Sequence, residues 1–160
     1  SNPLQKQDDL DSFEKALAQV LSDLSEMLVA DGEGVSKVVK IRVINAADDN
    51  DAYICAKHIS ESLLVKTAIF GNDPNWGRIA CAAGYSGAQL IEEKLSIFFE
   101  KIALLKKGSP QPFDQEQLNG ILQKDRYTIT IDLDLGNSET EILTSDLTYD
   151  YVKINAEYST

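Results

Sequence analysis

The first segment with a clear hydrophobic pattern runs from residue 8 to residue 30. Its apolar residues recur every three or four positions, and charged residues fill the positions between them. This period predicts an amphipathic helix. The apolar positions are Leu10, Phe13, Leu17, Val20, Leu21, Leu24, Met27 and Leu28. The turn at residues 31–34 follows, and we expect Gly32 to adopt the left-handed conformation that ends the helix.

Three shorter segments carry helical signals, either apolar residues at helical spacing or an aspartate that can cap a first turn. These helices are expected at residues 51–62, 74–84 and 114–124. In the second of them we expect Asp73 to be the N-cap and Pro74 the first helical residue, because proline lacks a donor that the first turn does not need. The apolar run at residues 63–71 is too short for its period to distinguish helix from strand.

Strand signals occur in two parts of the chain. β-branched residues dominate residues 35–44, and apolar and polar residues alternate along residues 126–135. Residues 139–144 are expected to return beside 126–135 as an antiparallel hairpin after a Gly-Asn-Ser turn. At residues 90–105 the apolar spacing fits a helix better than the two-residue period of a strand.

Length and composition place these elements in one domain. The chain has 160 residues, of which 43% are hydrophobic and 26% charged, and it contains no internal repeat or low-complexity linker. We therefore expect a single α+β domain over residues 1–160. Ser1 and Asn2 are interpreted as residues of an expression tag.

Charge and hydropathy narrow the classes of partner. With 26 acidic and 15 basic residues the net charge is −11, which argues against a nucleic-acid partner and favours cationic small molecules. The sequence contains neither the roughly 20 consecutive apolar residues of a membrane span nor a signal peptide. We expect no membrane association and a cytoplasmic location.

Cysteine and histidine offer little chemistry in this sequence. Cys55, Cys81 and His58 do not have metal-ligand spacing, and two cysteines are too few for a secreted disulfide framework. Both thiols are expected to be reduced and buried. His58 is expected to be a structural residue, since no carboxylate that could orient a Cys55–His58 dyad is evident.

Two turns could hold a charged ligand. The run at residues 71–78 could bind an anion through backbone donors and Arg78, or it could be a capped turn with Trp76 as a packing anchor, and the residues alone do not decide between these interpretations. It lacks the lysine and glycine spacing of a nucleotide P-loop. Glu33 could meet a cationic ligand, although a solvated acid in a helix-terminating turn is the commoner case.

The C-terminal segment is unusual for a tail. Residues 148–160 carry aromatic and apolar side chains that a disordered terminus normally lacks. We expect the segment to dock on the core, which would bring Asn155 and Thr160 to a defined place.

Three motifs make the sequence resemble the ornithine acetyltransferase (glutamate N-acetyltransferase) family. They are Asp-Gly-Glu-Gly at residues 31–34, Leu-Val-Lys-Thr-Ala-Ile-Phe-Gly-Asn-Asp-Pro-Asn-Trp-Gly-Arg-Ile at 64–79, and Asp-Leu-Thr-Tyr-Asp-Tyr-Val-Lys-Ile-Asn-Ala-Glu-Tyr-Ser-Thr at 146–160. The resemblance implies mixed helices on a largely antiparallel sheet. It also implies that residues 90–105 form a strand hairpin, which replaces the helix that their spacing favours.

The family resemblance implies a precursor that cleaves itself before a threonine. That threonine takes the acetyl group of N-acetylornithine, releases ornithine and passes the acetyl group to glutamate. No metal or other cofactor is implied, although acetyl-CoA is an alternative donor in the full enzyme. The implied partners are the preceding part of the protein, a first (alpha) chain, and further copies in an oligomer of alpha–beta units.

Residue by residue, the resemblance assigns substrate contacts to Glu33, Asn155 and Thr160. Lys66 and Arg78 receive no such role and are expected to be structural. The family's Ala-Thr-Met-Leu cleavage motif does not occur in this sequence. We therefore expect no acetyl transfer by this chain alone and no catalytic residue in it.

Two alternatives remain beside the acetyltransferase interpretation. The first is a non-catalytic module of the same fold that binds an amino acid or mediates assembly. The second is a related self-cleaving amidase or peptidase, which the quoted motifs favour less.

Overall fold

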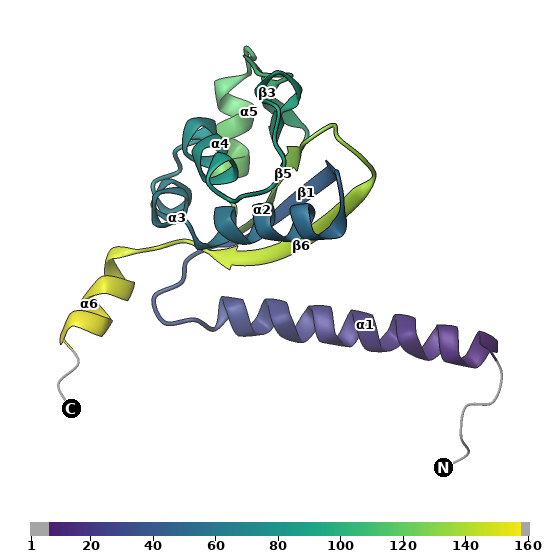
Figure 1. Ribbon diagram of the computed structural model, residues 1–160. Helices are drawn as coiled ribbons and strands as arrows, with labels where there is room; N and C mark the ends of the chain where they lie inside the picture. The colour runs from purple at the N-terminus through teal and green to yellow at the C-terminus, as the bar shows by residue number, and fades with distance from the viewer. Residues whose placement is uncertain (1–6, 158–160) are drawn as a thin grey trace.

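The structure is a computed structural model that describes residues 7–157 (Figure 1). The elements follow the order α1 (Gln7–Ala30), β1 (Val38–Ala46), α2 (Asp49–Glu61), α3 (Leu63–Phe70), α4 (Trp76–Gly84), the 3-10 turn η1 (Glu92–Lys94), β2 (Ser96–Phe99), β3 (Ile102–Lys106), β4 (Ser109–Pro110), α5 (Gln115–Leu122), β5 (Arg126–Asp132), β6 (Ser138–Ser145) and α6 (Tyr149–Glu157). The expected α+β class with a largely antiparallel sheet is confirmed.

A single six-stranded sheet organises the described part of the chain, with the strand order β4-β3-β2-β5-β1-β6. Only the β1–β5 pair is parallel, and the other neighbours are antiparallel. The strand hairpin implied for residues 90–105 is confirmed as β2 and β3. The expected hairpin between residues 126–135 and 139–144 is wrong, because β1 lies between β5 and β6.

Backbone hydrogen bonds explain why β5 and β6 are not joined by a tight turn. The amides of Leu133, Leu135 and Gly136 donate to the carbonyls of Ile44 and Asn45 at the end of β1. The chain therefore crosses the end of β1 before β6 returns along its other edge. Alternation along 126–135 identified the buried face of the strand correctly, but it carries no information about which strand is the neighbour.

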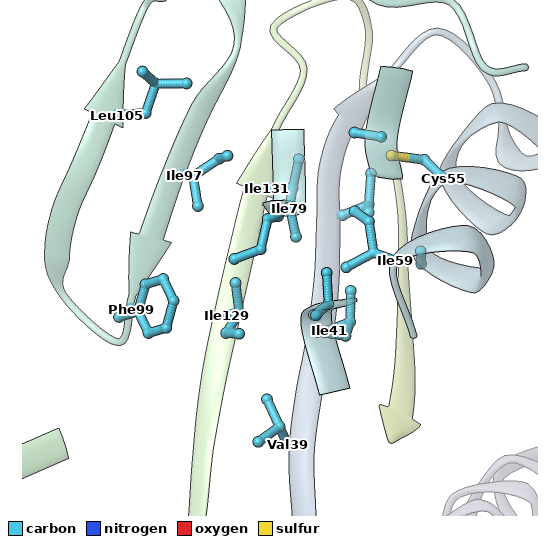
Figure 2. Packing of buried hydrophobic residues seen from close by; sticks show 14 of the residues in the cluster. Val39, Ile41, Cys55, Ile59, Ile79, Ile97, Phe99, Leu105, Ile129 and Ile131 are labelled. Atoms are coloured by element: carbon cyan, nitrogen blue, oxygen red, sulfur yellow. The ribbon is translucent and has the colours of Figure 1, made fainter. Parts of the chain in front are cut away.

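The core lies on the face of the sheet that α2 covers. In Figure 2, Ile41, Ile129 and Ile97 project from three adjacent strands, and Cys55 and Ile59 of α2 lie beside them. All five side chains are fully buried. Burial of aliphatic side chains on one face of β1, β5 and β2 stabilises the sheet and fixes α2, which forms one wall of the cleft described below.

Helix α1 does not use its apolar stripe to pack on this core. It lies apart from the body of the molecule in Figure 1. Every apolar residue of the stripe is at least 42% exposed, and Leu28 reaches 76%. Arg126 of β5 and Glu26 of α1 form an ion pair of 2.5 Å, which links the helix to the sheet. The predicted helix is confirmed, but its apolar face has no partner within residues 7–157.

Capping residues mark the starts of the remaining helices. Asp48 and Asp114 cap α2 and α5, and the undecided segment 63–71 is a helix capped by Ser62. The expected start of the next helix is wrong: α4 begins at Trp76, and Asn75 is its N-cap. Asn75 Oδ1 accepts from the amide of Arg78 at 3.1 Å, whereas the carboxylate of Asp73 accepts from the side chain of Asn75.

No helix within residues 7–157 is long and apolar enough to cross a membrane.

Candidate functional site

A cleft of about 1060 Å³ opens between α1, α2, α3 and β6. The turn that carries Glu33 lies at its rim, and Lys66 and Ser145 line it from α3 and β6. Tyr151 of α6 also contributes to the lining. The volume lies just above the range of about 300 to 1,000 Å³ that is typical of small-molecule pockets.

The Glu33 turn is held against the first residues of α6. Gly34 rather than Gly32 adopts the left-handed conformation, with φ of 70°, which corrects the sequence expectation. A Cβ atom at Gly34 would lie 2.5 Å from the backbone nitrogen of Tyr151, so only glycine fits at this approach. The hydroxyl of Thr148 donates to the Gly34 carbonyl at 2.6 Å. These contacts fix the backbone beside Glu33, whose side chain is exposed.

Asp146 anchors the other end of the same turn. Its side chain is 3% exposed, and Oδ1 accepts from the amides of Ser36 at 3.0 Å and Lys37 at 3.1 Å. Oδ2 accepts from the Ser36 hydroxyl. Because Ser36 and Lys37 donate to this carboxylate, β1 begins at Val38 rather than at residue 35. Residues 110 positions apart are thereby joined behind the cleft.

Lys37 is buried and stabilises the fold. Its ammonium donates to the carbonyls of Ile69 at 3.2 Å and Leu122 at 2.8 Å and to the side chain of Asn72. These carbonyls belong to the last turns of α3 and α5, where the helix leaves acceptors without internal partners. Burial lowers the pKa of Lys37, while the charges of Asp146 and Asp125 act in the opposite direction.

Lys66 is half-buried and points its ammonium toward β6. Nζ donates to the hydroxyl of Ser145 at 3.2 Å, and the Lys66 carbonyl accepts from the amide of Leu147 at 3.2 Å. Removal from water lowers the pKa of Lys66, and the charge of Asp146 opposes this effect. Lys66 therefore has a fixed position and a poorly solvated charge.

Most charged side chains that line the cleft have charged partners. The pairs are Glu26–Arg126 at 2.5 Å, Lys40–Glu141 at 2.8 Å and Lys57–Glu61 at 3.9 Å. Asp146 is satisfied by Ser36 and Lys37. Within residues 7–157, Glu33, Lys66 and Asp146 are the lining charges that form no ion pair within 4 Å.

The other two residues to which the resemblance assigns substrate contacts do not line the cleft among the described residues. Asn155 is exposed on α6, and its amide donates to the Tyr151 carbonyl at 2.8 Å. Thr160 lies outside the described residues. The expected docking of the C-terminal segment holds only at its start, where Tyr149 packs edge-on against Phe70, because no residue of α6 is buried.

The structure favours a capped turn at residues 71–78. The guanidinium of Arg78 donates to the Leu64 carbonyl at 2.9 Å and to the Thr67 hydroxyl at 3.3 Å. Trp76 is partly buried against the core. Asn75 already accepts from the amide of Arg78, so one of the backbone donors of this helix start is not free to bind an anion.

Cysteine and histidine have separate environments. Cys55 is fully buried, and burial raises the pKa of its thiol to about 11, although a hydrogen bond with Ser86 acts in the opposite direction. Cys81 is exposed, so the expectation that both thiols are buried is wrong. It lies on the outer side of α4, away from the small residues that pack inward. His58 is exposed on α2.

Sequence reasoning missed the pairing state of Lys66. Its hydrogen-bond partner Ser145 lies 79 positions away. The charged side chains that pair with other residues around the cleft lie on α1, α2, β1 and β6. No local pattern around residue 66 signals this arrangement. By contrast, Glu33 was identified because its motif resembles a known family.

Comparison with known proteins gives consistent matches. A sequence model of the ArgJ family matches residues 1–160. The arginine biosynthesis bifunctional protein ArgJ of Syntrophotalea carbinolica is 48% identical over 149 residues, which cover 92% of this chain and 38% of that protein. A glutamate N-acetyltransferase of Methanosarcina acetivorans is 46% identical, with 94% of this chain and 40% of that protein covered.

A solved structure has the same fold. The crystal structure of the arginine biosynthesis bifunctional protein ArgJ from Bacillus halodurans superposes with a TM-score of 0.92 at 41% identity, and the match covers 98% of this chain and 75% of that one. The chain thus spans about two fifths of the length of the curated relatives it matches.

Proposed function

Because the chain belongs to the ArgJ family, we propose that it forms the amino-acid-binding part of a glutamate N-acetyltransferase of arginine biosynthesis. The observation that carries the proposal is the 46% identity, across 94% of the chain, to a protein named glutamate N-acetyltransferase. The cleft beside Glu33 supports it, since the cleft suits a small ligand and presents a carboxylate to an ammonium group.

The proposed reaction is covalent acyl transfer. A threonine hydroxyl from the rest of the protein attacks the acetyl carbonyl of N-acetylornithine and gives its proton to the threonine's own α-amine. The C–N bond then breaks, and ornithine leaves as the amine after taking up that proton. The amine of glutamate attacks the resulting acetyl ester, which yields N-acetylglutamate and restores the hydroxyl.

This chain contributes binding groups to that reaction. Glu33 accepts hydrogen bonds from the ammonium of the ornithine side chain. The resemblance assigns Asn155 and Thr160 to the same pocket, although Asn155 does not line the cleft in this structure. The nucleophilic threonine belongs to the remaining three fifths of the protein, since the Ala-Thr-Met-Leu motif does not occur among these 160 residues. The same remaining part covers the apolar stripe of α1 in the assembled alpha–beta protein.

The test is an acetyl-transfer assay on the protein encoded by the extended reading frame. We expect transfer from N-acetylornithine to glutamate in that protein and none in the 160-residue chain. Glu33→Gln should raise KM for N-acetylornithine roughly tenfold or more, because a charged hydrogen-bond acceptor is lost. The control is Glu116→Gln, which removes an exposed charge on α5 outside the cleft and should leave the kinetics unchanged.

The assay also addresses the alternative function. A full-length protein that folds and binds N-acetylornithine without transferring its acetyl group would favour the non-catalytic binding module. Absence of both binding and transfer would contradict the proposal.

A further inference from the structure

The cleft follows the free edge of β6. Every residue from 141 to 147 lines it. Because successive side chains of a strand point to opposite faces, a site on one face of the sheet would touch only every second residue. The lining also includes Lys40, which pairs with Glu141 on one face, and Tyr53 of α2, the helix that covers the other face. The cleft therefore straddles the edge of the sheet and opens onto the backbone of β6.

Backbone groups along this edge have no partner in the described part of the chain. The amide of Asp146 donates to the Lys37 carbonyl. In an antiparallel pair, residues that bond to the neighbouring strand alternate with residues that do not. Thr144 therefore also faces β1, whereas Leu143 and Glu141 point their amides and carbonyls away from it. A strand edge of this kind is a template for a further strand.

The two edges of the sheet are built differently. β4, the outermost strand at one edge, has two residues and includes Pro110. Short strands and proline are common means by which proteins keep an edge from pairing. β6, at the other edge, has eight residues and no proline, and its glutamates pair with Lys40 and Arg42 of β1. The edge at β6 thus lacks the protection that β4 has.

We propose that a strand from the remaining three fifths of the longer protein pairs with β6 and extends the sheet by one strand. The inference rests on the proposed longer protein but not on its activity. The chain spans about two fifths of the length of its curated relatives, so enough sequence lies outside it to supply a strand. Leu28 and Val29 of α1 form the opposite wall of the cleft and offer such a strand apolar contacts. The Glu33 turn is anchored at Asp146, beyond the end of β6, so a strand paired with β6 does not occupy it.

A second copy of this chain fits the edge less well. Pairing of β6 with β6 about a two-fold axis would place Glu139 and Glu141 of both copies on one face of the joined sheet, where like charges oppose one another. The net charge of −11 on each chain adds to the repulsion. These charges favour a strand of different sequence as the partner of β6.

Amide hydrogen exchange followed by NMR tests the pairing in the full-length protein. The amides of Glu141 and Leu143 should exchange roughly 100-fold or more slowly than in the 160-residue chain, because they gain acceptors. The amide of Ile142, which faces β1, is the internal reference and should be slow at both lengths. If the 160-residue chain does not fold, the three amides are compared within the full-length protein, where their rates should agree to within about tenfold. Fast exchange of Glu141 and Leu143 in the full-length protein overturns the inference.

Proline substitution separates pairing from mere coverage of the edge. Glu141→Pro removes an amide that faces away from β1, and Glu141→Ala is the matched control, which loses the same ion pair with Lys40 but keeps the amide. In the full-length protein the proline variant should melt at least about 3 °C below the alanine variant, whereas in the 160-residue chain the two should melt within about 2 °C of each other. Leu143→Pro against Leu143→Ala repeats the comparison if Glu141→Pro does not fold.

Two results of these measurements contradict an added strand. A difference between proline and alanine that is equal at both lengths, or absent, means that the edge gains no strand partner in the full-length protein. Protection of the Glu141 and Leu143 amides in the 160-residue chain that grows with its concentration assigns the edge to a second copy. Either result overturns the inference.

Acetyl transfer measured on the same proteins separates this inference from the proposed function. Transfer without protection of Glu141 and Leu143 leaves the function intact and rejects the added strand. Protection in a full-length protein that transfers no acetyl group rejects the function and retains the strand.

Discussion

Lys37 and Asp146 are adjacent buried charges that are neutralised mainly by the backbone. The carboxylate of Asp146 accepts from two amides, and the ammonium of Lys37 donates to two carbonyls at helix ends. Each charge is thereby compensated by dipoles that the fold holds in place. Lys66 differs from both because its Nζ donates to a single hydroxyl.

Cys55 should make stability fall in alkaline solution. Burial raises the pKa of its thiol from 9.0 to about 11, so the native state keeps the proton between these values while the unfolded chain loses it. The stability that Cys55 contributes is present below pH 9 and is lost as the pH rises through 11. Denaturant titrations at pH 8 and pH 11 should therefore show a decrease that is about 2 kcal/mol larger in the wild type than in Cys55→Ala.

Cys81→Ala is the matched control for this titration. Cys81 is exposed on α4, so its removal should leave the wild-type decrease intact. An equal decrease in unfolding free energy in the wild type and Cys55→Ala would contradict the raised pKa of Cys55, because the two proteins share all other titrating groups.

At the scale of elements, the junction between the Glu33 turn and α6 requires that residue 34 be a glycine, which has no side chain. Gly34→Ala should cost more than about 1 kcal/mol of unfolding free energy, because it combines a positive φ with a contact of 2.5 Å to the Tyr151 nitrogen. Gly120→Ala in α5 is the counterpart, since a Cβ there meets nothing within 4 Å. It should stabilise the protein by about 0.5 to 1 kcal/mol.

Urea unfolding measures the change in unfolding free energy in Gly34→Ala and in Gly120→Ala. Equal effects of the two substitutions would mean that the approach of α6 to the turn does not constrain the fold. Loss of N-acetylornithine binding in Gly34→Ala alone would link the same junction to the position of Glu33.

At the scale of the whole molecule, the exposed apolar stripe of α1 provides a test of the proposed longer protein. Glutamine in place of Leu17, Leu21 and Leu24 should change the stability of the 160-residue chain by less than about 1 kcal/mol, because these side chains are already 42 to 55% exposed and glutamine is also a good helix former. In the full-length protein the same triple variant should lose several kcal/mol, since each leucine would leave an apolar interface.

Thermal and denaturant unfolding of the 160-residue chain and of the full-length protein measures this difference. Lys15→Gln on the charged face of α1 should be neutral in each. A triple variant that is equally stable in both lengths would show that the stripe remains in solvent in the full protein.

The sequence predicted most elements, but it did not predict their long-range neighbours. Capping by Asp114 and alternation along 126–135 are local signals, and both were interpreted correctly. The partner of β5 was wrong because pairing with β1 depends on strands about 90 residues apart. The substrate role of Glu33 was predicted from a motif and stays a prediction, whereas the contact of Lys66 with Ser145 joins residues 79 positions apart and has no local signal.

The interior position of β1, between β5 and the edge strand β6, has a consequence for synthesis. Ile41 pairs with Ile129 on one side and with Ile142 on the other, so after Ile41 the ribosome must add 88 residues to reach the first partner and 101 residues in all to reach the second. During that interval an apolar strand is present with both edges open, a condition that favours aggregation. The first strand to be made is thus an interior strand of the finished sheet, and its second edge is covered only when β6, the last strand, has been made.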